Sequence, residues 1–192
     1  MRLLFAFILV LLPQGTEPIQ HQLDLEPMLH DADTLKKLTI MHHQPGDRGN
    51  QVFFVRGDGS LIVQGCPKRP MPTPEVPTCK NKVSQEKVKE LVRLLIQKHF
   101  WDLPERQFIF VYASQTGEEL ELHTIAVDDG YARASRAFGV GTYAGKQESI
   151  PADFSAIEEQ LKQLKDFTLH TSEKPCHFAP AIEFGNNRTS LL

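Results

Sequence analysis

Apolar residues recur with the period of an α-helix along residues 83–104. One face of this segment carries Val88, Leu91, Val92 and Leu95. Ser84 precedes the stripe at the position of an N-cap, where its hydroxyl can accept a backbone N–H of the first turn. Pro104 disfavours helical backbone at the residue before it, so the helix is predicted to end near His99 or Phe100.

Shorter runs predict an antiparallel sheet. The strongest hairpin signal is the Gly-Asp-Gly turn at residues 57–59, which separates two runs of β-branched and aromatic residues. The predicted strands are residues 38–42, 52–56, 60–64, 120–127 and 131–138. A further run at residues 108–112 is apolar throughout, a pattern that does not separate a strand from an irregular buried segment.

A second amphipathic helix is predicted over residues 151–165, where Pro151 suits the first turn. Its apolar stripe consists of Phe154, Ile157, Leu161 and Leu164. The order of strand, hairpin, helix, strands and helix predicts an α+β fold. We expect one mainly antiparallel twisted sheet with two amphipathic helices packed on one face.

The first 16 residues have the pattern of a secretory signal peptide. Arg2 precedes the apolar run at residues 3–12, which is shorter than the roughly 20 residues that span a bilayer. We therefore expect an exported protein, either periplasmic or secreted. A retained N-terminal anchor is the alternative, because Pro13 lies where a cleavage site usually has a small residue. The remaining chain is predicted to comprise a linker over residues 17–37, one domain over residues 38–167 and an irregular tail over residues 168–192.

Charge and composition narrow the range of partners. The formal net charge is −3 at pH 7, and no basic stripe is interleaved with aromatic residues, so nucleic acid is not expected as a partner. No transmembrane span is expected beyond the signal segment. The partner that we expect is another extracytoplasmic protein, and the chain itself is expected to be a monomer.

Histidines are the candidates for a metal-binding or catalytic site. His42 and His43 are adjacent, and neighbouring residues of a strand point to opposite faces, so the two are not expected to bind one ion. His123 could supply a further ligand, but no acidic residue lies at a diagnostic spacing. The common hydrolase, phosphate-loop and dinucleotide motifs do not occur. We expect no catalytic residue, metal or cofactor, and a metal-dependent hydrolase using His42, His43 or His123 is an alternative.

Three cysteines allow one disulfide, with three choices of pair. Cys66 and Cys79 flank a segment with five prolines, for which we expect an extended loop without helix or sheet pairing. Their short separation favours a bridge between these two residues and leaves Cys176 as the odd thiol. The candidate partner-contact residues are Lys68 and Arg69 at the tip of this loop. An inert, clipped connection is the alternative.

Several of these features together resemble small exported bacterial domains of unknown function. They are the turn at residues 57–59, the Val83-Ser84 helix start, the F-W-D-L-P exit at residues 100–104, the Asp129-Gly130 turn and the closing L-x-x-L helix. The resemblance spans residues 38–164 and implies a non-catalytic extracytoplasmic binding or interaction module. The helix exit and the closing helix are also similar to emfourin, a proteinaceous inhibitor of thermolysin-like metalloproteases, which implies a metalloprotease inhibitor as an alternative. The insert from Cys66 to Cys79 departs from both groups, and no binding residue carries over.

Overall fold

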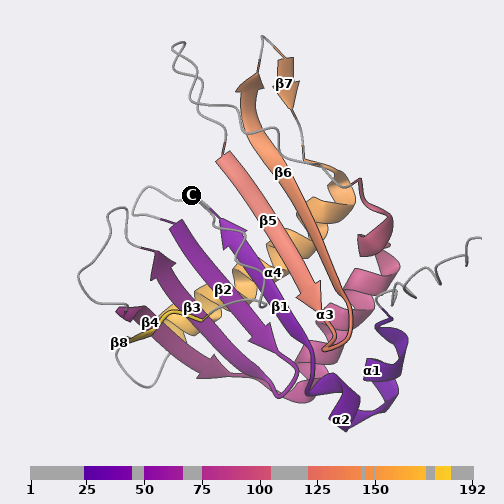
Figure 1. The fold of residues 1–192 in the computed structure, drawn as a ribbon, viewed down its shortest axis with the longest axis vertical. Coiled ribbons are helices and arrows are strands. Elements are labelled where there is room, and N and C mark those ends of the chain that lie inside the picture. Colours follow the sequence, from indigo (N-terminus) through magenta and orange to yellow (C-terminus); the bar gives the residue numbers. More distant parts are fainter. Residues whose placement is uncertain are drawn as a thin grey trace, which may run out of the picture.

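The computed structural model of this 192-residue chain describes residues 24–44, 50–66, 75–104, 121–143, 146–148, 150–171 and 176–182. Within these ranges the strands form one eight-stranded sheet in the order β7-β6-β5-β1-β2-β3-β4-β8 (Figure 1). Every neighbouring pair in this sheet is antiparallel. The predictions for residues 1–16, for residues 108–112 and for Lys68 and Arg69 fall outside the described residues.

The strands are β1 (Thr39–Gln44), β2 (Asn50–Arg56), β3 (Ser60–Cys66), β4 (Glu75–Lys82), β5 (Glu121–Asp128), β6 (Arg133–Tyr143), β7 (Lys146–Glu148) and β8 (His177–Pro180). The helices are α1 (Glu26–His30), α2 (Ala32–Leu35), α3 (Gln85–Gln97) and α4 (Ala152–Thr171), with a short 3-10 helix η1 (Phe100–Asp102). The predicted α+β architecture is confirmed, and the five predicted strands correspond to β1, β2, β3, β5 and β6. β4, β7 and β8 are additional strands outside the predicted set.

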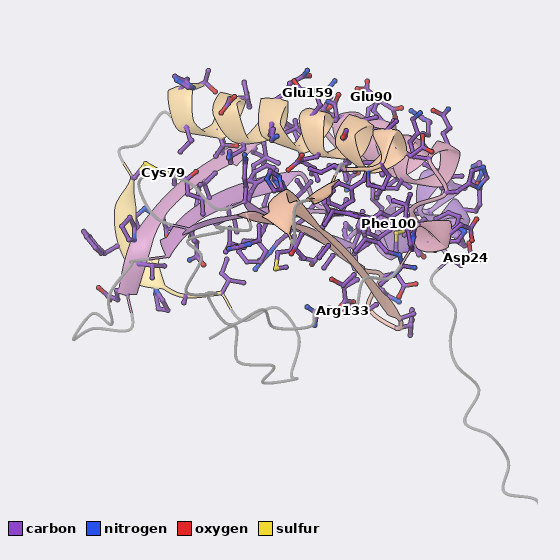
Figure 2. The ribbon with its side chains drawn as sticks, turned by 90° about the horizontal axis from the view of Figure 1, so that it is seen from above. Asp24, Cys79, Glu90, Phe100, Arg133 and Glu159 are labelled. Atoms are coloured by element: carbon purple, nitrogen blue, oxygen red, sulfur yellow. A yellow bond between two sulfur atoms is a disulfide. The ribbon has the colours of Figure 1, made fainter. Side chains whose placement is uncertain are left out.

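α3 begins where its sequence pattern predicts and ends at Gln97, two residues before the predicted His99. The Ser84 hydroxyl accepts a hydrogen bond from the backbone N–H of Lys87 at 3.3 Å. The four predicted stripe residues, Val88, Leu91, Val92 and Leu95, are buried. Beyond the end of α3, His99 has a left-handed φ of 46°, and η1 then places Phe100 in the core (Figure 2).

Two apolar clusters lie on opposite faces of the sheet. Because successive strand residues point to opposite faces, Ile40 and Met41 of β1 belong to different clusters. The larger cluster joins the sheet to α3 and α4, which cover the same face, as predicted (Figure 2). The smaller cluster, on the other face, contains Met41, Phe54, Ile62 and Ala126.

The predicted linker is wrong for residues 24–37, because this part of the chain belongs to the domain. Leu25 and Met28, from the turn that opens α1, are buried in the larger cluster together with Leu35 of α2. The backbone N–H of Asp24 also donates to the Asp129 carboxylate at 3.4 Å. Polar neighbours and prolines mask these three core residues in the sequence.

The predicted irregular tail is wrong for residues 168–171 and 177–180. α4 continues beyond residue 165 to Thr171, and the buried Thr168 hydroxyl donates to the Leu164 carbonyl at 2.8 Å. β8 then pairs with β4 at the edge of the sheet, in the register Thr78↔His177 to Glu75↔Pro180. The tail therefore completes the sheet.

Candidate functional site

Two of the three candidate histidines lie side by side beneath α4. His42 of β1 pairs in register with Ile125 of β5, so His123, two residues away on β5, points to the same face as His42. His43 points to the opposite face, as the alternation of a strand requires. The structure therefore brings His42 and His123 together and separates His43 from them.

Glu158 of α4 completes this cluster. Its Oε1 atom accepts a hydrogen bond from Nε2 of His42 at 3.1 Å and another from Nδ1 of His123. Its Oε2 atom lies 3.2 Å from Nζ of Lys162, one helical turn further along α4. The exposed fractions of His42, His123 and Glu158 are 1%, 6% and 3%, so bulk solvent hardly reaches the cluster.

The sequence analysis does not select Glu158, although a signal for it exists. Glu158 follows the stripe residue Ile157 and lies four residues after Phe154, which places an acidic residue inside the apolar face of α4. A buried carboxylate needs a charged or hydrogen-bonding partner. The pattern alone does not tell which strand supplies that partner.

Burial is the largest influence on the pKa values of both His42 and Glu158. Burial lowers the pKa of His42 below its ordinary value of 6.5 and outweighs the hydrogen bond to Glu158, which acts to raise it. Burial acts to raise the pKa of Glu158, but the hydrogen bonds from His42 and His123 outweigh it, and the pKa falls from 4.5 to about 2. At neutral pH the cluster therefore holds an ionised Glu158 and a neutral His42 that donates from Nε2.

This arrangement joins a helix to two strands. Both histidines donate to the same carboxylate oxygen of Glu158, which therefore accepts a hydrogen bond from one nitrogen of each ring. Within the part of the chain that the structure describes, no group of three His, Cys, Asp or Glu residues could hold a metal ion. The geometry suits a buried tie between α4 and the strands β1 and β5.

The predicted disulfide between Cys66 and Cys79 is wrong, because Cys79 is bonded to Cys176. The Cα atoms of Cys79 and Cys176 are 4.3 Å apart, although the two residues are 97 positions apart in the chain. In the β3–β4 pairing Cys79 lies opposite Val63. Cys66 is three residues further along β3, a displacement of about 10 Å along the strand.

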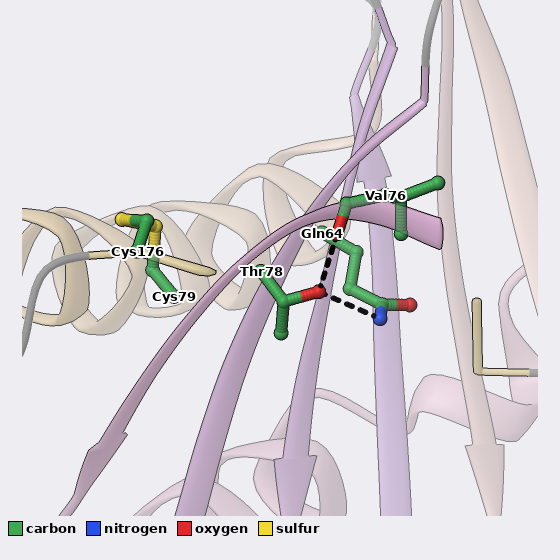
Figure 3. Close-up of a disulfide and its surroundings, with 5 residues drawn as sticks. All are labelled: Gln64, Val76, Thr78, Cys79 and Cys176. Atoms are coloured by element: carbon green, nitrogen blue, oxygen red, sulfur yellow. Dashed lines mark hydrogen bonds between the residues drawn. A yellow bond between two sulfur atoms is a disulfide. The ribbon is translucent and has the colours of Figure 1, made fainter. Parts of the chain in front are cut away.

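The local expectation behind that bridge also fails. Residues 66–79 are not a loop throughout, because β4 begins at Glu75 and contains Pro77. The fixed φ of proline fits an extended strand. Because proline has no backbone N–H, it removes only one hydrogen bond from the sheet. Once β8 has paired with β4, Cys176 lies beside Cys79 (Figure 3).

Close to the disulfide, a buried polar network contacts the backbone of Pro180 and Ile182. Gln64 of β3 and Thr78 of β4 face each other in register, and the Gln64 amide donates to the Thr78 hydroxyl at 3.1 Å (Figure 3). The Thr78 hydroxyl in turn donates to the Val76 carbonyl at 3.0 Å. The Gln64 amide also donates to the Pro180 carbonyl at 3.0 Å, and its oxygen accepts the Ile182 N–H at 2.8 Å. The side chains of Gln64 and Thr78 are buried, and Gln64 uses its amide to bind the backbone of another segment of the chain.

No protein-family model and no curated protein matches this chain. Among the helices that the structure describes, none has the length and apolar character needed to cross a membrane.

Proposed function

We propose that this chain is a non-catalytic binding module that acts outside the cytoplasm, with another extracytoplasmic protein as its partner. The observation that carries the proposal is the environment of its histidines. An enzyme that used His42 and His123 would have to present them to a substrate. Both side chains are instead buried beneath α4, and both donate to Glu158.

The disulfide supports the extracytoplasmic part of the proposal. Disulfides persist in oxidising compartments and are rare in the cytosol. The bridge between Cys79 and Cys176 joins the residue that precedes β8 to β4, which is the arrangement expected of a structural disulfide. The signal-like pattern of residues 1–16 is independent of the cysteines and supports the same compartment.

The test is affinity capture from the extracytoplasmic fraction of the source cells, with the chain lacking residues 1–16 as bait. We expect one partner to be retained at a fixed ratio by the folded bait and lost when the bait has been denatured before coupling. Capture at the same level by the denatured bait would contradict the proposal.

A second arm of this test addresses the enzymatic alternative. The purified chain is assayed with ester, amide and phosphate ester substrates, with and without added Zn²⁺, beside the variants His42→Gln and His123→Gln. We expect no turnover above the buffer rate. Turnover that either variant abolishes, while its circular dichroism spectrum stays unchanged, would overturn the proposal in favour of a hydrolase.

A further inference from the structure

The last described residues of the chain pair with β4, bond to Gln64 of β3 and reach the smaller apolar cluster. We call residues 176–182 the C-terminal segment, and we call the surface under it the docking face. β8, within the segment, pairs with β4 in an antiparallel register, and Ile182 packs against the smaller apolar cluster. That cluster contains Met41, Phe54, Ile62 and Ala126.

The docking face binds the segment mainly through its backbone. Gln64 contacts the carbonyl of Pro180 and the N–H of Ile182 with its one side-chain amide. The ladder between β4 and β8 adds contacts of the same kind. Pairing of an added strand together with an apolar anchor at alternate positions is a general way of binding an extended peptide. The exposed Phe178 side chain takes no part in this anchoring, since 59% of its surface is accessible.

The disulfide keeps the segment in place. Cys176, the first residue of the segment, is bonded to Cys79 of β4. A tethered ligand has a high effective concentration, which an untethered competitor would have to exceed to displace it. Reduction by a dithiol delivers two electrons and two protons to the bridge, releases both thiols and converts the dithiol into a disulfide. The segment then stays on the docking face through its non-covalent contacts, and it remains joined to α4 through the chain.

We propose that the docking face is a peptide-binding site whose partner is the C-terminal segment of a second copy of this chain, exchanged while Cys79 and Cys176 are reduced. Every copy carries both the face and the one sequence that the structure places on it. Mutual exchange makes the same contacts twice across a two-fold axis and closes a dimer. The inference rests on the proposed binding role and names one partner for it.

The test uses two full-length variants, both carrying Cys66→Ser. The acceptor has Cys176→Ser and keeps the Cys79 thiol; the donor has Cys79→Ser and keeps the Cys176 thiol. Neither chain can form the native bridge by itself. The two are mixed at high concentration with oxidised glutathione, which takes up two electrons and two protons and leaves as two glutathione thiols when the bridge forms between chains.

We expect a covalent heterodimer on a non-reducing gel, with a peptide linking Cys79 to Cys176 in the mass spectrum of a digest. Two further changes should lower its yield at least tenfold: Ile182→Asp in the donor and Gln64→Ala in the acceptor. The matched control is Phe178→Ala in the donor, which should leave the yield unchanged because that side chain is exposed.

Two results would overturn the inference. One is a yield of Cys79–Cys176 heterodimer no higher than that of the acceptor–acceptor and donor–donor dimers. The other is a yield that Ile182→Asp and Gln64→Ala leave unchanged, since the thiols would then react without docking. Neither result bears on the proposed function, which depends on partner capture and on the absence of turnover.

Discussion

Nε2 of His42 on β1 lies 3.1 Å from the carboxylate of Glu158 on α4, although the two residues are 116 positions apart in the chain. The contact joins β1, an interior strand of the sheet, to α4. Both side chains are buried, so each depends on the other for a partner that water cannot replace.

Removing the carboxylate should therefore destabilise the fold strongly. We expect Glu158→Ala to lower the free energy of unfolding by about 1 to 3 kcal/mol for each buried histidine N–H that loses Glu158 as its acceptor. Guanidinium unfolding followed by circular dichroism measures this difference. The matched control is Glu159→Ala, at the neighbouring position on the outer side of α4 (Figure 2), where the expected change is within about 0.5 kcal/mol. Equal effects of the two substitutions would contradict the role given to Glu158.

Stability should fall on acidification in two steps. The pKa of His42 is lower in the folded chain than its ordinary value of 6.5, so the unfolded chain takes up this proton first and stability decreases below about pH 6.5. The pKa of Glu158 is lowered from 4.5 to about 2, so the stability from its ionised form is present above pH 4.5 and is lost as the pH falls toward 2. Unfolding curves measured between pH 8 and pH 3 test both windows.

His42→Gln separates the two steps, because glutamine keeps an N–H donor and has no proton to gain. We expect the variant to lose the decrease that begins near pH 6.5 and to keep the decrease below pH 4.5. A variant with the same pH profile as the parent chain would show that His42 does not titrate as described.

Gly57 should tolerate no side chain. A Cβ atom at this position would lie 1.5 Å from the Leu35 carbonyl oxygen, which belongs to the backbone and cannot move aside alone. We expect Gly57→Ala to lower the melting temperature by several degrees, since about 1 kcal/mol shifts it by roughly 2 to 4 °C in a chain of this size. The control is Gly65→Ala, where the nearest heavy atom is 3.9 Å away and the change should be small. Thermal unfolding measures both melting temperatures, and an equal decrease in the two variants would contradict the close contact at Gly57.

The bridge between Cys79 and Cys176 should stabilise the fold. Cys176→Ser opens a loop that the bridge closes over 97 positions, and the expected loss is about 2 to 5 kcal/mol. Cys66→Ser should leave the bridge intact, with the Cys79–Cys176 peptide still present in a non-reducing digest. A digest in which Cys66 and Cys79 are linked would contradict the structure.

The sequence predicts those elements whose pattern is local. The stripe of α3 and the Gly-Asp-Gly turn between β2 and β3 are legible because each is defined by residues within one short segment. β4 and β8 cannot be predicted from a local pattern of this kind. Pro77 argues against a strand, and three of the four residues of β8 are exposed, so neither segment shows the alternation of a half-buried strand. β4 is a strand because it pairs with β3 and β8, and β8 is a strand because it pairs with β4.

The candidate site shows the same division. The opposite directions of His42 and His43 follow from strand geometry alone. The meeting of His42, His123 and Glu158 depends on the register between β1 and β5 and on the path of α4. The choice of Cys176 over Cys66 depends on a strand pair that no local pattern predicts.

The strand order also constrains how a chain made from its N-terminus can fold. The β2–β3 hairpin needs only neighbouring residues, whereas β1 gains its second neighbour only when β5 (Glu121–Asp128) has been made, and β4 gains its second neighbour only with β8. Until then β1 and β4 each present an unpaired strand edge, which can pair with another nascent chain. Pairings so distant in sequence also form slowly. A chain whose synthesis stops after β4 and before residue 121 presents both edges and is therefore the species most prone to aggregate.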